Sequence, residues 1–376
     1  MITMCDYYGM CDENGRCVGH PVKVTMEYGQ MLKSLGEELR LVCSPCIAKD
    51  VEGSLFAEIV RMPYDISIVG SSFFKRITDK FKLFKNIKFA LRSTGTVFFY
   101  HMDFFFFLYL QLFYHKSPDR KIVILIYHQD FTGGRFAGCL KKIYEKALRK
   151  VDGVIYTQKG AVVPHGNAAW MPDYIYRADE YEKYQKAFKI NRVVCLGTMN
   201  RYKQIEELIE VWRSLVKDNE QGEITRENEP GDDDYRFIPE LVIAGRFDTK
   251  ERYEAIIKDL PKNVTVRNEL LSLDDYMDLL AGSMYSILPY DMGQYQNRTS
   301  GILLESIYCG TIPIAPKELL EQNKLPGLGY NELSGLGELL ETAEENLSQE
   351  FEKVYKEYGT DYATGIMHKM LIGNMA

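Results

Sequence analysis

Short apolar runs alternate along the chain with longer stretches in which apolar residues recur at helical spacing. Runs rich in β-branched and aromatic residues predict strands, and their alternation with helices is typical of a parallel sheet covered by helices. In the first half the predicted strands are residues 2–6, 38–43, 65–70, 96–100, 121–127 and 153–156, with helices that include 22–35 and 138–150. The first half is therefore predicted to be a Rossmann-like domain.

A second series of the same kind begins near residue 192. Its predicted strands are residues 192–197, 241–245, 263–266, 285–288 and 311–315. Apolar residues at helical spacing predict a helix after the first strand, at Ile205, Leu208, Ile209, Trp212 and Leu215. A short helix is predicted at 273–280. The repeated pattern predicts two α/β domains, which also implies a cleft between them.

The boundary between the two series is predicted at residues 170–190, where Met171-Pro172-Asp173 breaks the pattern and a charged helix, 177–188, follows. The predicted organisation is an N-terminal Rossmann-like domain at 1–175, a C-terminal Rossmann-like domain at 176–345, and a C-terminal helix at 346–376 as a candidate to return to the first domain.

Residues 217–236 are almost wholly polar and predict a long solvated loop. The acidic run at 232–234 within them is interpreted as a surface feature and not as a metal site.

Composition and charge narrow the class of protein. The 376 residues are 46% hydrophobic and 26% charged, which is typical of a folded globular chain. A formal net charge of −7 argues against a nucleic-acid partner, because such proteins usually carry a basic surplus. The first residues lack the basic segment and apolar core of a secretory signal, and the chain has no apolar run of about 18 residues. We therefore expect a cytoplasmic protein.

The chain has 8 cysteines, of which five fall within the first 46 residues. Cys43 and Cys46 have a spacing that zinc accepts, but Cys5, Cys11 and Cys17 do not follow a familiar finger pattern. We expect reduced thiols and no bound metal.

The stretch 296–315 places Glu305 among apolar residues of a predicted helix. Thr299 or Ser300 is a suitable cap for that helix, and Gly310 is a suitable end. The amides around Ser300 and Gly301 then face outward at a helix N-terminus, which favours an anion such as a diphosphate. Because Glu305 lies one turn further on the same face, we interpret it as an acceptor for sugar hydroxyls.

A second anion-binding candidate is the loop 197–203, directly after the first strand of the second domain. Ligands of open parallel sheets gather at the carboxyl ends of strands, where this loop and the stretch 296–315 are both predicted. Arg201 and Lys203 are candidates to neutralise a diphosphate leaving group.

Several motifs together resemble a known family. They are Gly197 to Lys203 with its following amphipathic helix, Leu241-Val-Ile-Ala-Gly245, Ser286-Ile-Leu-Pro289, Ser300-Gly301, Leu304-Glu305-Ser306 and Cys309-Gly310-Thr-Ile-Pro-Ile-Ala315. Over residues 190–330 the chain resembles the nucleotide-sugar domain of the retaining family 4 glycosyltransferases (glycosyl transferases group 1). The resemblance implies the GT-B fold, two Rossmann-like domains with parallel sheets facing across a cleft.

The resemblance also implies roles for single residues. Glu305 falls at the family's ribose-binding glutamate, and Lys203 falls at its diphosphate-facing lysine. The chain departs from the family where Asn297 replaces the glutamate beside the transferred sugar and Thr198 replaces an arginine. We keep Asn297 as a catalytic candidate because it can hydrogen-bond a sugar hydroxyl, and we expect Arg201 to supply the missing charge.

The first domain is expected to supply the acceptor side. His128 follows a strong predicted strand, where the family often has a histidine near the reacting sugar, and it is our second catalytic candidate. Asp130 lies close by in sequence, His101 follows another strand, and Gly15 lies in the loop after the first strand. A histidine at a strand end can equally be a surface or core residue.

Residues 72–92 contain seven Lys or Arg and one Asp, with apolar residues at helical spacing at Phe73, Ile77, Phe81, Phe84, Ile87 and Leu91. Such a helix can rest on an anionic membrane surface. The alternative is an ordinary domain helix with a solvated basic face.

The function expected from these features is a retaining glycosyltransferase that needs no metal or other cofactor. It would move a sugar from a nucleoside diphosphate-sugar to a glycan or lipid-linked acceptor in cell-surface polysaccharide synthesis. A catalytically impaired homologue that acts as a scaffold or partner of an active glycosyltransferase is the main alternative, and a nucleotide-sugar epimerase is a third.

Overall fold

The computed structural model describes residues 1–11, 17, 21–51, 53–67, 73–127, 137–226, 238–295, 300–341 and 347–373. The chain forms two compact units. The first unit contains residues up to Asp173 together with the segment that starts at Thr360, and the second extends from Tyr174 to Gly359.

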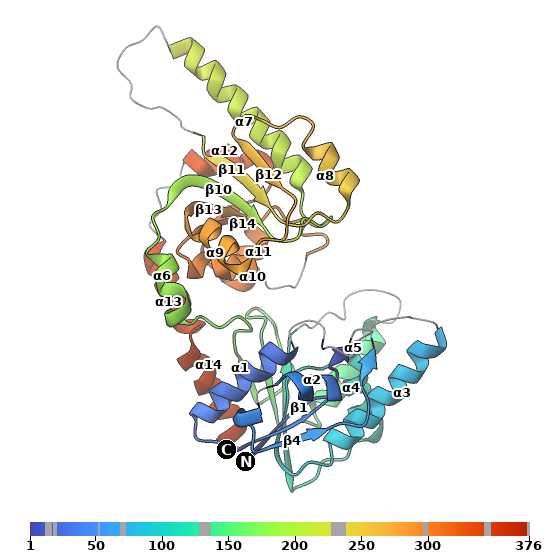
Figure 1. Ribbon diagram of the computed structural model, residues 1–376. Helices are drawn as coiled ribbons and strands as arrows, with labels where there is room; N and C mark the ends of the chain where they lie inside the picture. Colours follow the sequence, from blue (N-terminus) through green and yellow to red (C-terminus); the bar gives the residue numbers. More distant parts are fainter. Residues whose placement is uncertain are drawn as a thin grey trace. The chain divides into compact units, whose positions relative to one another are not determined.

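The first unit is built on a seven-stranded parallel sheet with the order β4-β3-β1-β6-β7-β8-β9 (Figure 1). Its strands are β1 (Ile2–Asp6), β3 (Leu39–Cys43), β4 (Glu58–Arg61), β6 (Gly95–Phe99), β7 (Arg120–Ile126), β8 (Gly153–Tyr156) and β9 (Ala168–Trp170). A separate two-stranded sheet pairs β2 (Met10–Cys11) with β5 (Ile66–Ser67).

Helices cover both faces of this sheet. On one face lie α3 (Phe73–Ala90), α4 (Phe104–Phe113) and α5 (Ala137–Leu148), whose apolar residues form one core with alternate residues of the strands. Contacts on the other face involve α1 (Pro21–Ser34), α14 (Thr360–Met367) and the π-helical turn η3 (His368–Ile372). The remaining pieces are α2 (Pro45–Asp50) and the 3-10 turn η1 (Gly53–Leu55).

The second unit has a six-stranded parallel sheet with the order β12-β11-β10-β13-β14-β15. Its strands are β10 (Ile190–Leu196), β11 (Glu240–Ala244), β12 (Val264–Arg267), β13 (Ser283–Ile287), β14 (Ile312–Pro316) and β15 (Leu328–Tyr330). Its helices are α6 (Ala178–Gln185), α7 (Ile205–Arg226), α8 (Lys250–Ile256), α9 (Leu273–Ala281), α10 (Gly301–Tyr308), α11 (Lys317–Asn323), η2 (Leu333–Gly335), α12 (Leu336–Glu341) and α13 (Ser348–Glu357). Apolar residues of α7, α8 and α12 form a core with one face of the sheet.

In each sheet successive strands are added first toward one edge and then, after one switch point, toward the other edge. The first strand of the first unit, β1, lies between β3 and β6, and β10 of the second unit lies between β11 and β13. In open parallel sheets the carboxyl ends of the strands at such a switch point flank the crevice where ligands bind. The ends of β1 and β6, and of β10 and β13, are therefore the positions to inspect for function.

The two series of strands predicted from the sequence are confirmed in their main members. The prediction missed β2, β4, β9 and β15, and the described part of the predicted strand 65–70 contributes only the short β5 to a separate sheet. The predicted solvated loop 217–236 was wrong in its first half, because α7 continues to Arg226. The segment predicted as one C-terminal helix consists of α13, α14 and η3.

The basic segment 72–92 contains α3, and three residues of its predicted apolar stripe face the unit itself. Ile87 and Leu91 belong to the core. Phe84 packs against aromatic rings of α4, with ring centroids 5.7 to 6.2 Å apart. Phe81 is 64% exposed, and the side chains of Phe73 and Ile77 lie outside the described residues. Among the stripe residues whose side chains are described, Phe81 is the one available to a membrane.

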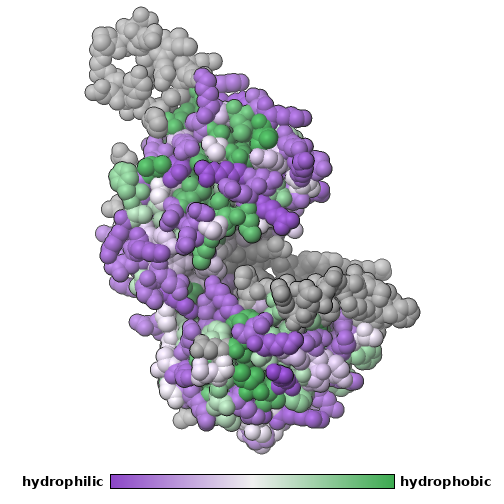
Figure 2. All heavy atoms as spheres, in the orientation of Figure 1, coloured by the Kyte–Doolittle hydropathy of each residue, from purple (hydrophilic) through white to green (hydrophobic). Residues whose placement is uncertain are grey.

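On the visible face of each unit hydrophilic residues predominate, and hydrophobic residues show in separate areas between them (Figure 2). No helix in the described part of the chain has both the length and the apolar character needed to cross a membrane.

Candidate functional site

The loop after β10 is the first feature at the switch point of the second sheet. Gly197 has φ +88°, and Gly245, after β11, has φ +154°. A Cβ on Gly245 would lie 1.8 Å from the Gly197 carbonyl oxygen, so only glycine allows the two backbones to approach this closely. The glycines fix the path of the loop 197–203.

Lys203 is the most unusual side chain of this loop, because it is a cation with only 4% of its surface exposed. Its ammonium donates to the carbonyl oxygen of Leu196 at the end of β10. Burial lowers the pKa of Lys203, and no carboxylate of a described residue pairs with it. By contrast, the Lys189 ammonium donates to three acceptors. An ammonium has three N–H donors, and within the described part of the chain only one of those on Lys203 has an acceptor.

Tyr290 joins this loop to the end of β13 and to the cap of α10. Its backbone pairs with Lys203 in an isolated bridge, and its ring centroid lies 5.9 Å from the Lys203 ammonium. Its hydroxyl lies 3.2 Å from Ser300 Oγ. Ile302 adds a second connection, because a Cβ on Gly197 would lie 2.9 Å from its Cδ1. The loop 197–203 and the start of α10 are therefore in contact.

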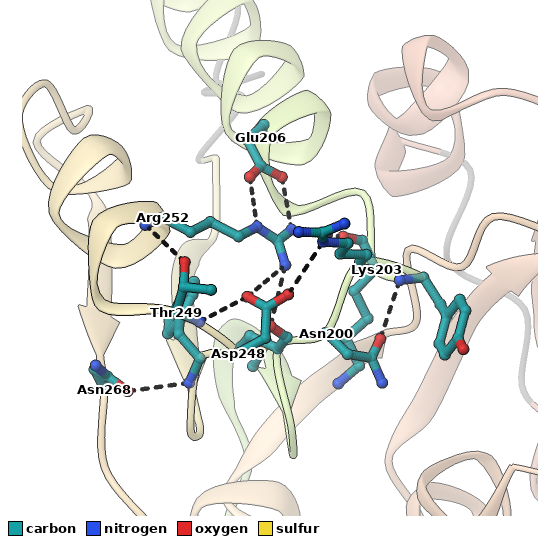
Figure 3. A network of polar contacts seen from close by, with 11 residues as sticks. Asn200, Lys203, Glu206, Asp248, Thr249, Arg252 and Asn268 are labelled. Carbon is teal, nitrogen blue, oxygen red and sulfur yellow. Dashed lines mark hydrogen bonds and ion pairs between the residues drawn. The ribbon is translucent and has the colours of Figure 1, made fainter.

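A network of charged side chains around Arg252 also contacts the loop 197–203 (Figure 3). The Arg252 guanidinium makes a bidentate pair with Glu206, at 2.6 and 2.7 Å. It also donates to the carbonyl oxygens of Met199 and Lys203, both at 3.0 Å. Because the guanidinium is planar and its donors are fixed, Arg252 fastens both ends of the segment 199–203 to α7 and α8.

The helix predicted after the Ser-Gly pair is α10, and Ser300 caps it by accepting a hydrogen bond from the Leu303 amide at 3.4 Å. Ser300 is buried, and Gly301 is the first residue of the helix. The first amides of an α-helix have no partner in the helix itself, so those of α10 add to the positive potential near Lys203.

Glu305, interpreted from the sequence as an acceptor for sugar hydroxyls, accepts hydrogen bonds from two protein side chains. Its Oε1 accepts from the Tyr174 hydroxyl at 2.7 Å, and its Oε2 accepts from the Tyr276 hydroxyl at 2.5 Å. The ring of Tyr174 also lies against Gly301, at 3.5 Å from the position of a Cβ there. The two phenols satisfy one lone pair on each oxygen, and a carboxylate can accept about four hydrogen bonds.

The other predicted donor-site residues are less well placed or lie outside the described residues. Thr198 is exposed. The side chain of Arg201 is 85% exposed and lies 3.9 Å from Asp248, so it is a solvated cation with a weak partner. Asn297 and Thr299 lie outside the described residues.

In the first unit the switch point contains a histidine paired with a carboxylate. His101 follows β6, and its Nδ1 lies 3.4 Å from Oδ2 of Asp6, the last residue of β1. Asp6 is fully buried, whereas 31% of the His101 side chain is exposed. Burial lowers the pKa of His101, but Asp6, assisted by Asp103, more than offsets this, so the pKa is raised above its usual 6.5.

Hydrogen bonds of Asp103 and an aromatic contact of Tyr8 surround the pair of His101 and Asp6. Asp103 caps α4 by accepting from the amides of Phe105 and Phe106, and it also accepts from the hydroxyl of the buried Tyr7. Burial raises the pKa of Asp103. The ring of Tyr8 stands edge-on to His101 at 5.2 Å. The other acceptor-side candidates, Gly15, His128 and Asp130, lie outside the described residues.

All 8 cysteines carry free thiols, and among the described residues no group of three or more His, Cys, Asp or Glu is placed to hold a metal ion.

Sequence reasoning missed Asp6, Tyr174, Tyr276, Tyr290 and Arg252 as parts of these sites. Asp6 was visible as a charged residue at the end of an otherwise apolar strand, which is a signal for a strand-end site. The tyrosines gave no such signal, because aromatic residues are common throughout the chain.

Comparison with known proteins gives a match at the level of structure only. No family model matches the chain, and no curated protein matches it in sequence. A UDP-forming α,α-trehalose-phosphate synthase from Burkholderia xenovorans, solved in complex with glucose-6-phosphate, is similar with a TM-score of 0.59 and 9% identity, over 98% of this chain and 99% of that one.

Two further solved structures cover the chain equally well. The N-terminal domain of trehalose-6-phosphate phosphatase from Candida albicans has a TM-score of 0.58 and 11% identity, over 100% of this chain and 97% of that one. UDP-GlcNAc 2-epimerase from Methanocaldococcus jannaschii has a TM-score of 0.54 and 8% identity, over 100% of both chains. With two parallel Rossmann-like sheets, these likenesses establish the GT-B fold, which transferases and an epimerase share.

Proposed function

We propose that the protein is a glycosyltransferase that moves a sugar from a nucleoside diphosphate-sugar to a glycan or lipid-linked acceptor in cell-surface polysaccharide synthesis. The observation that carries the proposal is Lys203, a buried cation at the switch point of the second sheet whose ammonium has, among the described residues, one carbonyl acceptor. A buried charge without a counter-charge is costly, so a diphosphate beside Gly197 would compensate it. The first amides of α10 would bind the same anion.

The ribose of the donor is assigned to Glu305. Tyr174 and Tyr276 hold the two carboxylate oxygens in place, and the remaining lone pairs can accept from two adjacent hydroxyls. Ribose offers such a pair of hydroxyls. The tyrosines therefore act as positioning residues for Glu305 in this proposal.

The stereochemistry implied by the resemblance to family 4 is retention, with an oxygen of the leaving diphosphate as the base for the acceptor. Lys203 and the start of α10 would stabilise the negative charge that develops on that diphosphate. We propose that no metal ion is required for this step, because the cation and the helix amides supply the positive potential.

Calorimetry with UDP, GDP and ADP tests the donor site. We expect one nucleotide to bind the native chain, and the Glu305→Ala and Lys203→Met variants to bind it about 10- to 100-fold more weakly, as expected for loss of hydrogen bonds to charged groups. Glu269→Ala and Lys262→Met are matched controls, because both residues are exposed on the same unit. Failure of all three nucleotides to bind would overturn the enzyme proposal and favour the impaired homologue acting as a scaffold.

A cytoplasmic location on the inner face of the membrane is a second part of the proposal. Phe81 on α3 and Leu112 and Phe113 on α4 are large exposed hydrophobic residues of neighbouring helices. Lysines of α3 lie among them, including Lys80, whose ammonium lies 3.9 Å from the ring centroid of Phe105. Anionic lipid headgroups would attract these lysines while the apolar side chains enter the headgroup boundary.

Sedimentation with vesicles that contain an anionic phospholipid tests this location. We expect binding that weakens as salt rises, and that is lost when Lys80, Lys82 and Lys85 are replaced by glutamate. Glutamate at Lys250, Lys258 and Lys262 makes the same change in net charge on exposed positions of the other unit. Equal binding by the two triple variants would contradict a docking role for α3.

A further inference from the structure

Arg201, Lys203 and Arg252 are cations in or beside the loop 197–203, and they differ in how the protein uses their donors. Arg201 is 85% exposed, and Lys203 is buried with one carbonyl acceptor among the described residues. The Arg252 guanidinium, by contrast, donates five hydrogen bonds. A guanidinium has five N–H donors, so Arg252 has none left for a phosphate. Beyond the effect of its charge, Arg252 can act on an anion only through the groups that it holds.

The acceptors of Arg252 belong to three separate segments. Its Nε and Nη2 make the bidentate pair with Glu206 in the first turn of α7. Its Nη1 lies 3.5 Å from Oδ1 of Asp248, which follows β11. The carbonyl oxygens of Met199 and Lys203 accept from Nη1 and Nη2, each at 3.0 Å. Because Arg252 itself belongs to α8, the guanidinium connects the loop to two helices and to the turn after β11 (Figure 3).

Lys203 is held mainly by its backbone. Its N–H donates to the Asn200 carbonyl oxygen at 3.1 Å, and its own carbonyl oxygen accepts from Arg252. Its backbone also pairs with that of Tyr290 in the isolated bridge. The ammonium has a single acceptor in the part of the chain that the structure describes. The direction of the ammonium therefore depends on the backbone, and Arg252 is one of the groups that fix this backbone.

We propose that Arg252, with Glu206 as its partner, is the positioning residue that keeps the Lys203 ammonium directed at the diphosphate of the donor. This inference rests on the proposed binding of a nucleoside diphosphate at Lys203, and Arg252 does not touch the diphosphate. Glu206 fixes the plane of the guanidinium through two charge-assisted hydrogen bonds, and the guanidinium fixes the two carbonyl oxygens of the loop. A lysine at position 252 would keep the charge but not this forked geometry.

Charge and geometry make opposite predictions for Glu206. Glu206→Gln removes a negative charge three residues from Lys203, so electrostatics alone would strengthen the binding of an anion. The glutamine amide would turn N–H donors of its own toward the guanidinium, so the pair would lose one of its two hydrogen bonds. The loop would then be held less firmly, and positioning predicts weaker binding.

Calorimetry on the full chain with UDP, GDP and ADP tests the role of Arg252. For the nucleotide that binds, we expect Arg252→Gln, Arg252→Lys and Glu206→Gln each to weaken affinity by about 10-fold, as for loss of the outer-shell partner of a metal ligand. Arg213→Gln is the matched control and should keep native affinity. Arg213 also pairs with a carboxylate of α7, and its side chain is 22% exposed, against 15% for Arg252. Tighter binding by Glu206→Gln, or native affinity in Arg252→Lys, would show that only charge matters and would overturn the proposal.

Amide hydrogen exchange of the nucleotide-free chain follows the loop itself. We expect faster exchange in peptides that cover residues 197–204 in Arg252→Gln and Glu206→Gln, and native exchange there in Arg213→Gln. Native exchange of these peptides in Arg252→Gln would contradict the positioning role.

A double-mutant cycle tests whether Arg252 acts through Lys203. In the Lys203→Met background the ammonium is absent, so we expect Arg252→Gln to weaken nucleotide binding by less than about 2-fold further. An undiminished effect in that background would overturn the inference. If none of the three nucleotides binds, the proposed function fails and this inference with it. If a nucleotide binds and Lys203→Met weakens it, but the Arg252 and Glu206 variants keep native affinity, only the inference is overturned.

Discussion

The Lys203 ammonium is buried and donates to the Leu196 carbonyl oxygen, and its burial makes the positive charge less stable in the folded protein than in the unfolded chain. Because its folded pKa lies below the unfolded 10.5, the unfolded chain binds more protons between these two values. The free energy of unfolding should therefore rise as pH increases toward 10.5 and level off above it, by about 1.4 kcal/mol for each unit by which the pKa is lowered.

Urea unfolding from pH 7 to 10.5 measures this effect as the difference between the native chain and Lys203→Met. The variant lacks the titrating group, so other lysines cancel in the difference. A difference that stays constant over this range would show that Lys203 is not held as a buried cation.

At the scale of single residues, the sequence indicated the position of Lys203 and Glu305 but not their surroundings. The spacing after a strand and within a helix placed both at one edge of a sheet. The hydrogen bond between Tyr174 and Glu305 joins residues 131 positions apart, and that between His101 and Asp6 spans 95. Contacts at such separations depend on the packing of whole elements, which local pattern does not encode.

At the scale of elements, the backbones of the turns after β10 and β11 approach each other closely near the candidate site, at Gly197 and Gly245. A Cβ on Gly245 would collide with the Gly197 carbonyl, and φ +154° is unfavourable for other residues. We expect Gly245→Ala to lower the free energy of unfolding by about 3 kcal/mol, since backbone would have to shift. The loop 197–203 would shift with it, so nucleotide binding should weaken as well.

Gly335→Ala is the control for this change, because a Cβ there meets no atom within 4 Å. Urea unfolding of the two variants gives the comparison. Similar stability of Gly245→Ala and Gly335→Ala would mean that the close approach of the two turns is not present in solution.

Elements were predictable where the pattern was strong. Buried strands such as β7 and β11 contain runs of four or five apolar residues, and they were found with nearly correct ends. The missed strands β2, β4, β9 and β15 have only two to four residues, and β4 has exposed ends. The end of α7 was missed because polar residues with good helix propensity carry no apolar periodicity.

At the scale of the whole molecule, the chain leaves the second unit at Gly359 and contributes its last helical segment to the first. Met367 and Met370 are buried there, and the Lys121 ammonium donates to the Gly373 carbonyl oxygen at 2.9 Å. We expect Met370→Ala to destabilise the first unit by about 2 to 5 kcal/mol, the usual cost of such a core truncation.

The two tryptophans allow this prediction to be measured for one unit alone. Trp170 belongs to the first unit and Trp212 to the second. In a Trp212→Phe background, fluorescence during urea unfolding follows Trp170. Lys369→Ala, an exposed neighbour in the same segment, is the control. A transition that Met370→Ala leaves unchanged would contradict the packing of this segment on the first unit.

Two Rossmann-like domains could be predicted from the sequence, because two series of alternating strands and helices define them at low resolution. The GT-B fold was what the resemblance to family 4 glycosyltransferases implied. The chemistry could be predicted only in part, since the same fold serves transfer and epimerisation in different proteins. The side chains at the two switch points carry that information, and the first of them, Asp6 with His101, became visible only once β1 and β6 were seen to be neighbours.

The central claim is that a nucleoside diphosphate binds where the loop after β10 meets the start of α10. Amide hydrogen exchange measured by mass spectrometry, with and without a saturating concentration of the nucleotide that binds in calorimetry, tests it most directly. The account predicts slower exchange in peptides that cover residues 197–204 and 300–309 of the native chain, and loss of that protection in Lys203→Met. Protection confined to other parts of the chain, or none at saturation, would contradict it.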